Sequence, residues 1–114
     1  MDKGFGLIVY PVRDLASAKG FYRSLLGVDP YADAAFYVGF RVGDQEIGLD
    51  PQGHSKGQTG PLPYWAVDDI KSALESLRAA GAQVHQDITT VGPGRQIAVV
   101  KDADGSLTGL IQGG

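Results

Sequence analysis

Glu46, Asp50 and Tyr64 are the side chains of this sequence best suited to chemistry. A carboxylate or a phenol can act as a general acid or base, and it can also hold one polar group of an organic ligand. No pair of carboxylates and no His–carboxylate spacing singles out a catalytic arrangement. The residue types therefore leave binding and catalysis both open, and no catalytic residue is assigned.

Few residues are suited to holding a metal ion. The sequence has no cysteine, which excludes disulfides, thiolate zinc sites and a cysteine nucleophile. His54 lies in a polar segment and His85 in an expected strand, so we interpret both as residues without a ligand role. Asp102 and Asp104 are typical of a turn in which the carboxylates accept from local backbone N–H groups.

The composition is that of an ordinary globular domain spanning residues 1–114, with 43% hydrophobic and 20% charged residues. The net charge is -3 and the ten basic residues are scattered, which argues against a nucleic-acid or membrane partner. The apolar run near the N-terminus is too short for a signal peptide or a membrane span. We expect a soluble, cytoplasmic protein.

Two segments have apolar residues at helical spacing, and a glycine follows each of them. Asp14–Leu26 begins at a good N-cap residue and is followed by Gly27, which suits the left-handed end of a helix. Asp68–Ala80 is the second helix. Gly20 weakens the first helix by roughly 1 kcal/mol, so we expect it to pack closely on a sheet.

The two halves of the chain repeat each other. A shift of 55 residues places Val12 on Val67 and Asp14 on Asp69, and each half reads strand, helix and three further strands. The expected strands are Leu7–Val12, Val28–Asp33, Phe36–Val42, Gln45–Asp50, Leu62–Val67, Gln83–Ile88, Arg95–Lys101 and Ser106–Gln112. An internal duplication outweighs local propensity. It predicts two tandem βαβββ modules, residues 5–50 and 62–112, joined by a Gly/Pro-rich linker at residues 51–61.

Short motifs in both halves carry a family resemblance. They are Val12-x-Asp14-Leu15, Phe21-Tyr22, Leu25-x-Gly27, Ala66-Val67-Asp68-Asp69-Ile70, Ala80-Gly81-Ala82, Gly94-Arg95, Asp102-Ala103-Asp104-Gly105 and Gly109-Leu110. Along its whole length the chain resembles the vicinal oxygen chelate superfamily of glyoxalases, bleomycin resistance proteins and extradiol dioxygenases, including its bacterial-type members. The resemblance implies an α+β fold in which an eight-stranded cupped sheet holds the ligand and the helices lie outside.

Metal-dependent members of the superfamily carry one ligand near the start of each module's first strand and one in its last strand. Those ligands are usually His, Gln or Glu. Carried over to this sequence, the four positions are Leu7, Gly48, Leu62 and Gly109. None has a side-chain donor atom for a divalent cation. The resemblance therefore implies a member without metal ligands, and we expect neither a metal nor a cofactor.

Strand alternation extends these positions to a pocket. Phe5 and Val9 share the face of Leu7, whereas Tyr10 and Trp65 point toward the helices. The expected ligand-binding residues are Leu7, Val9, Glu46, Gly48, Asp50, Leu62, Tyr64, Arg95, Gly109 and Ile111. The two glycines would leave room in this pocket, and its carboxylates suit an apolar or cationic organic ligand.

Two functions remain open. The first is a metal-free small-molecule binding protein of this superfamily that sequesters an antibiotic or another organic ligand. The alternative is a metal-independent isomerase or lyase that uses a pocket carboxylate or tyrosine. The resemblance further implies a homodimer, with the modules paired within one chain or exchanged between two. The sequence does not identify the ligand.

Overall fold

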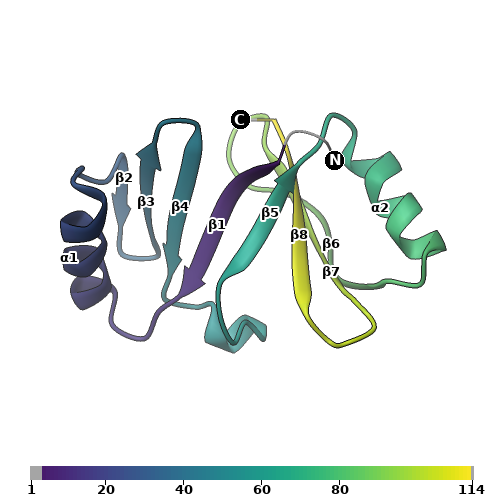
Figure 1. Ribbon diagram of the computed structural model, residues 1–114, viewed down its shortest axis with the longest axis horizontal. Coiled ribbons are helices and arrows are strands. Elements are labelled where there is room, and N and C mark those ends of the chain that lie inside the picture. The colour runs from purple at the N-terminus through teal and green to yellow at the C-terminus, as the bar shows by residue number, and fades with distance from the viewer. Residues whose placement is uncertain (1–3, 114) are drawn as a thin grey trace. The chain divides into compact units, whose positions relative to one another are not determined.

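The same order of elements occurs twice in the computed structural model, which describes residues 4–113 (Figure 1). Each half runs strand, helix and three strands, so the α+β fold of two tandem βαβββ modules is confirmed. The chain divides into two compact units. One comprises residues 7–62, and the other comprises residues 63–113 together with the residues just before Leu7. No helix within residues 4–113 is long and apolar enough to cross a membrane.

The first module has strand order β2-β3-β4-β1, in which β1 is parallel to β4 and the other neighbours are antiparallel. Its elements are β1 (Phe5–Pro11), α1 (Leu15–Leu26), β2 (Ala32–Ala34), β3 (Tyr37–Val42) and β4 (Gln45–Asp50). The expected strand Val28–Asp33 is wrong over most of its length. Pro30 has no backbone N–H to donate to the ladder, so β2 begins only after it.

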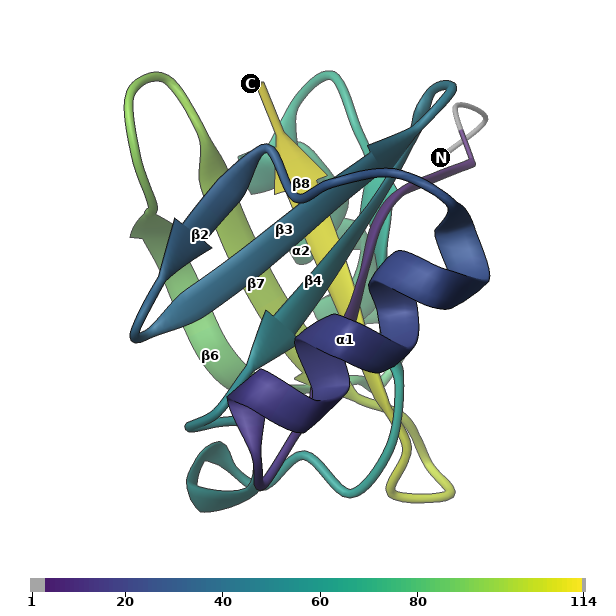
Figure 2. The ribbon, with the colours of Figure 1, turned by 90° about the vertical axis from the view of Figure 1, so that its left-hand side faces the viewer.

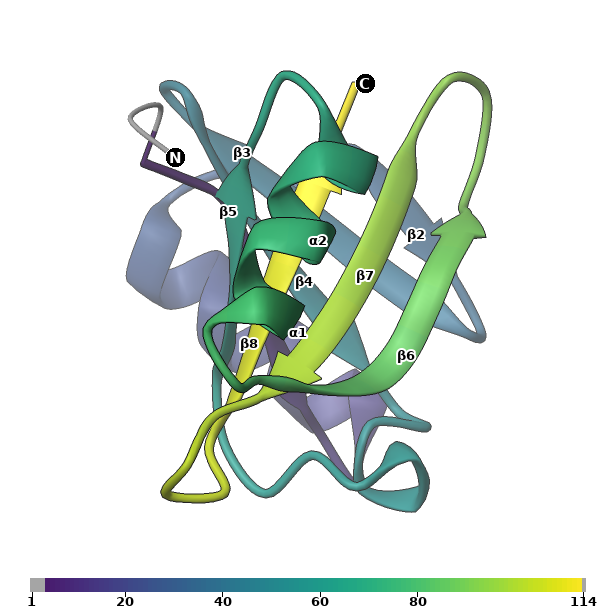
Figure 3. The same cartoon turned by 90° about the vertical axis from the view of Figure 1, so that its right-hand side faces the viewer.

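The second module repeats this arrangement with strand order β5-β8-β7-β6. Its elements are β5 (Leu62–Ala66), α2 (Ile70–Ala79), β6 (Gln83–Thr90), β7 (Gln96–Lys101) and β8 (Leu107–Gln112). Figure 3 shows α2 lying across β8 on one face of this sheet. The pairing of β6 with β7 is interrupted by register shifts, whereas β7 and β8 pair without a break.

Each helix packs apolar side chains against one face of its own sheet. Figure 2 shows α1 crossing the first sheet, where Tyr10 and Tyr22 pack on a buried cluster around Phe40 and Leu49. In the second module Trp65 packs on the corresponding cluster beneath α2. The expectation that Tyr10 and Trp65 face the helices is therefore confirmed. The opposite face of each sheet is the one on which the expected ligand-binding residues lie by strand alternation.

Gly20 is not packed on the sheet, contrary to the expectation from sequence. It is exposed, and a Cβ atom built there would meet no atom within 4 Å. With Gly27 it lines a shallow groove on α1 that also includes Arg23 and Asp29. The glycine therefore weakens the helix without filling a structural need.

Replacing Gly20 with alanine should raise the free energy of unfolding by about 1 kcal/mol, because alanine is the better helix former and restricts the unfolded chain. Urea unfolding of the two proteins measures this difference. Gly27→Ala is the matched control, since that residue also faces open space but has a φ of 72°, which a side chain strains. The control should destabilise, and a loss of stability in Gly20→Ala would contradict the exposed placement.

Asp14 caps α1 as expected. Its carboxylate accepts from the backbone N–H of Ser17 at 3.1 Å and from the Ser17 hydroxyl at 3.1 Å. The backbone hydrogen bond, followed by the hydroxyl, lowers the pKa of Asp14 below its ordinary value of 3.8. The charged form of this side chain is therefore the one that stabilises the helix.

The contribution of Asp14 should depend on pH. Because its pKa is lower in the folded state, the stabilisation is fully present above the ordinary value of 3.8 and is lost as pH falls through the folded value. We expect the stability difference between wild type and Asp14→Asn to shrink on acidification into that range. Denaturant unfolding across a pH series measures it. A difference that stays constant to the acid limit would contradict this role.

Candidate functional site

The face of the first sheet away from α1 carries the residues that strand alternation placed together. Leu7 and Val9 on β1 are buried there, and they lie in register with Glu46 and Gly48 on β4. On the other side of β4, Gly48 pairs with Gly39 of β3. These partners define one surface made from three strands of a single module.

Tyr37 covers Gly48 on this surface. A Cβ atom built at Gly48 would lie 2.7 Å from Cζ and 2.8 Å from Cε1 of the Tyr37 ring. Such distances are far below van der Waals contact, so the ring can lie there only because the residue is glycine. The space expected at Gly48 is therefore filled by an aromatic side chain from the neighbouring strand.

The second module uses the same device on the face of its sheet away from α2. Tyr64 of β5 is 4% exposed and pairs directly with Gly109 of β8. A Cβ atom at Gly109 would lie 2.7 Å from Cε2 and 2.8 Å from Cγ of the Tyr64 ring. Tyr64 thus fills the space expected at Gly109. Leu62 and Ile111 are buried on the same two strands.

Tyr31, which precedes β2, joins Glu46 and Arg41 in a polar cluster that sequence reasoning missed. The Tyr31 hydroxyl donates to Glu46 Oε1 at 2.5 Å, and an Arg41 nitrogen lies 3.7 Å from the same oxygen. The Arg41 guanidinium carbon lies 4.4 Å from the centre of the Tyr31 ring. A Cβ at Gly39 would lie 3.0 Å from the phenol end of Tyr31, so the glycine permits this position. Hereafter, the tyrosine face means the surface carrying Tyr31, Tyr37, Arg41 and Glu46.

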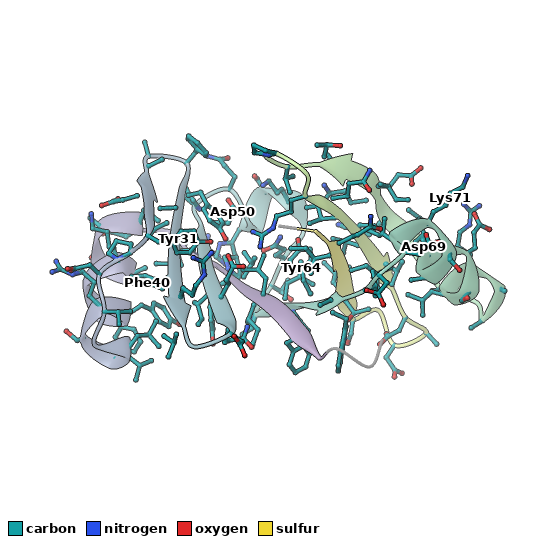
Figure 4. All side chains as sticks on the ribbon, turned by 90° about the horizontal axis from the view of Figure 1, so that it is seen from above. Tyr31, Phe40, Asp50, Tyr64, Asp69 and Lys71 are labelled. Carbon is teal, nitrogen blue, oxygen red and sulfur yellow. The ribbon has the colours of Figure 1, made fainter. Side chains whose placement is uncertain are left out.

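Glu46 is not an exposed residue at a strand edge. Its side chain is 12% exposed because the Tyr31 phenol covers it and Arg41 pairs with it. Figure 4 shows Tyr31 among the side chains of the first module, with Phe40 of the same sheet close to α1. The carboxylate is therefore held in a defined position on the tyrosine face.

Asp50 lies in register with Pro11 at the end of β4 and is buried. Its carboxylate accepts from the backbone N–H of Gln52 at 2.8 Å and from Lys56 Nζ at 2.8 Å. These bonds close the segment after β4, where η1 (His54–Lys56) forms a short 3₁₀ helix. Both bonds are local, so Asp50 orders the start of the segment that was expected to be a linker.

Arg95 and Phe5 lie in different surroundings from the other candidates. Arg95 is half-buried just before β7, and its carbonyl accepts from the backbone N–H of Val91 at 2.9 Å. The Phe5 ring lies 4.1 Å from that of Trp65, which packs on the core beneath α2. Phe5 is exposed, and its expected place on the face of Leu7 stays a prediction.

The other residues considered as metal ligands are Asp102, Asp104, His54 and His85. Asp102 accepts from the backbone N–H groups of Asp104 and Ser106, both at 2.9 Å, so the interpretation as a turn is confirmed. His85 is exposed on β6, and His54 lies in η1. In the part of the chain that the structure describes, no three His, Asp or Glu side chains gather where they could hold a metal ion.

Comparison with known proteins places this arrangement in a family. A family model described as the Glyoxalase/Bleomycin resistance protein/Dioxygenase superfamily matches residues 4–110. The chain belongs to this superfamily. The resemblance seen in the sequence is therefore confirmed across both modules. No curated protein sequence matches the chain significantly.

Solved structures of superfamily members and other proteins share this fold at low sequence identity. A superfamily member from Vibrio splendidus is 15% identical with a TM-score of 0.73, covering 94% of this chain and 96% of its own. A Streptomyces coelicolor methylmalonyl-CoA epimerase variant in complex with 2-nitronate-propionyl-CoA is 16% identical, with a TM-score of 0.72 and 97% of both chains covered. A Mn(II)-bound glyoxalase from Novosphingobium aromaticivorans is 19% identical, with a TM-score of 0.74, 96% of this chain covered and 38% of that chain.

The Mn(II)-bound relative raises the question of whether this chain's residues fit a metal. The positions carried over from metal-dependent superfamily members hold Leu7 and Gly48 in the first module, and Leu62 and Gly109 in the second. Manganese prefers oxygen and nitrogen donors, and none of these side chains has one. The rings over both glycines also occupy the space that a longer ligand side chain would need. The residues present therefore do not fit a metal at these positions.

Proposed function

We propose that this superfamily member binds a small organic molecule without a metal ion, on the tyrosine face of its first module. The observation that carries the proposal is the Tyr37 ring over Gly48. Where a metal ligand would be expected, this face offers an aromatic ring instead. Aromatic rings beside a few placed polar groups are typical of small-molecule sites.

The polar groups of this face support an ordered site. Glu46 is fixed by Tyr31 and Arg41, and Leu7 supplies apolar surface on the adjacent strand. Arg41 and Lys56 balance the charges of Glu46 and Asp50. A cationic ligand would have to displace one of these pairs, so we no longer favour positive charge as the ligand's main feature. An antibiotic or another organic molecule remains the proposed ligand.

The proposal is tested by screening planar organic compounds for thermal stabilisation of EDTA-treated protein. A ligand that binds only the folded state must raise the melting temperature. We expect hits to act equally with and without EDTA, and to shift the backbone amide resonances of Gly39 and Gly48. Tyr31→Ala should weaken binding, whereas Phe21→Ala on the exposed side of α1 should not. Binding that requires added manganese or maps to α1 would refute the proposal.

A metal-independent isomerase or lyase is the second candidate. The hydrogen bond between the Tyr31 hydroxyl and Glu46 favours it, because a phenol and a carboxylate held together can pass a proton to or from a substrate. One relative by fold is named as an epimerase. Tyr31→Phe and Glu46→Gln should then abolish turnover but leave ligand binding within a few-fold. Full recovery of unchanged ligand after incubation would favour the binding protein.

We also propose that the protein acts in the cytoplasm as a homodimer. The absence of cysteine is compatible with a reducing compartment, and closed two-fold assemblies are the commonest oligomers. Light scattering coupled to size exclusion measures the mass directly. A mass corresponding to one chain of 12.0 kDa across the accessible concentration range would rule out the homodimer.

A further inference from the structure

The guanidinium group of Arg41 is held in position, but its hydrogen-bonding capacity is not used up. Its carbon lies 4.4 Å from the Tyr31 ring centre, and one nitrogen lies 3.7 Å from Glu46 Oε1. Arg41 and Glu46 therefore form an ion pair, but the two atoms are too far apart for a hydrogen bond. Within residues 4–113 no hydrogen bond from Arg41 is formed, and its side chain is 55% exposed. Two partners therefore hold the guanidinium while its N–H donors face solvent.

This arrangement differs from that of three other cations in the unit of residues 7–62. Lys56 donates to Asp50 at 2.8 Å, and Lys19 donates to Asp33 at 2.7 Å. Arg23 on α1 lies 2.7 Å from Asp29. Each of these groups already has a carboxylate within hydrogen-bonding distance, whereas Arg41 does not. Arg41 is therefore better prepared than these three cations to accept an external anion.

We propose that Arg41 anchors the anionic group, a carboxylate or a phosphate, of an organic acid bound on the tyrosine face. The planar fork of a guanidinium matches both groups through two parallel hydrogen bonds. The stacked Tyr31 ring restricts the side chain before binding, which lowers the entropic cost of docking. This inference rests on the proposed function, because it names the class of ligand that the same face takes.

Glu46 sets the direction from which the anion must approach. Its carboxylate is the acidic group that faces Arg41, and it repels a second anion on its own side of the guanidinium. The ligand's acid therefore binds on the solvent-facing side of Arg41. The organic body then lies toward Tyr31 and Tyr37, and its face can stack on an aromatic ring.

Three probes of one shape test the anchor: benzoate, phenyl phosphate and the neutral benzamide. Their dissociation constants are measured by NMR titration of the full chain, together with the side-chain Nε–H resonance of Arg41. We expect the better acid to bind at least about tenfold more tightly than benzamide, the effect of one charge-assisted contact. The acid that binds more tightly shows whether the anionic group of the ligand is a carboxylate or a phosphate.

Variants of Arg41 show whether the preference for the acids comes from its charge or from a change elsewhere in the protein. Arg41→Gln should remove the preference for the acids, and Arg41→Lys should keep part of it. Arg23→Gln is the matched control, because Arg23 is 53% exposed and lies on α1. It should leave every constant unchanged. Equal binding of benzamide and the acids on this face, or no binding of either acid, overturns the anion anchor. In the compound screen, failure of all hits to reach this face overturns the proposed function itself.

Discussion

Gly109→Ala should destabilise the protein by about 1 to 3 kcal/mol, the range for overpacking a filled interior. The added methyl group would lie 2.8 Å from Cγ of Tyr64, which is the base of the ring. A ring that is 4% exposed and attached at that point cannot swing aside without moving β5. The loss is measured as the change in free energy of unfolding in urea.

Two further glycines calibrate this result. At Gly48 the closest atoms belong to the hydroxyl end of Tyr37, which can move more easily, so Gly48→Ala should cost less than Gly109→Ala. Gly60→Ala should change stability little, since nothing lies within 4 Å of its Cβ position. Tyr64→Ala combined with Gly109→Ala should show a favourable coupling energy, because the clash is then absent. Additive losses in the double variant would contradict direct contact between ring and glycine.

Phe40→Ala should destabilise the protein by about 3 to 5 kcal/mol, the usual cost of removing a phenylalanine from a closed core. Phe40 is 0% exposed at the centre of the cluster beneath α1. Its removal leaves a cavity that the neighbouring Leu49 and Tyr22 cannot fill without losing their own contacts. Because total stabilities of small domains are only about 5 to 15 kcal/mol, this variant should be near the limit of folding.

Phe36→Ala is the matched control for Phe40. It removes the same side chain four residues away, where Phe36 is 74% exposed between β2 and β3. The control should alter the free energy of unfolding by less than about 0.5 kcal/mol. Urea unfolding monitored by far-UV circular dichroism compares the two. A similar loss in both variants would place Phe40 outside the core of the first module.

Much of the fold could be predicted because the two halves of the sequence repeat the same local patterns. The match of Val12 with Val67 exposed the duplication, and the duplication fixed the order of the elements. The alternation of Tyr10 and Trp65 with their neighbours identified which face of each sheet meets its helix. Strand β2 was misplaced because Pro30, a single residue without an N–H, decides where the ladder starts.

The tyrosine face could be predicted only in part. Alternation along β4 correctly placed Glu46 and Gly48 on one surface, since side-chain direction follows directly from strand period. It gave no sign of Tyr31 or Tyr37. A long ring reaches sideways over a neighbouring strand, and the register that brings it there depends on pairing between β3 and β4. The pattern of a tyrosine beside cross-strand glycines is a usable signal once the register is known.

That pattern also changes the meaning of the glycines. From sequence, Gly48 and Gly109 were interpreted as free space left by lost metal ligands. In the structure a tyrosine ring packs directly on each glycine, one in each module. A ring packed on a cross-strand glycine stabilises the sheet, and the Tyr37 ring also adds aromatic surface to the face proposed to bind the ligand.

The chain carries aromatic rings, rather than metal ligands, at these positions. Elemental analysis of protein incubated with manganese, nickel and zinc and then desalted tests this most directly. We expect none of the three metals to remain in a stoichiometric amount. One equivalent of any of them per chain, retained by wild type and released on substitution of residues in either module's tyrosine–glycine pair, would contradict it.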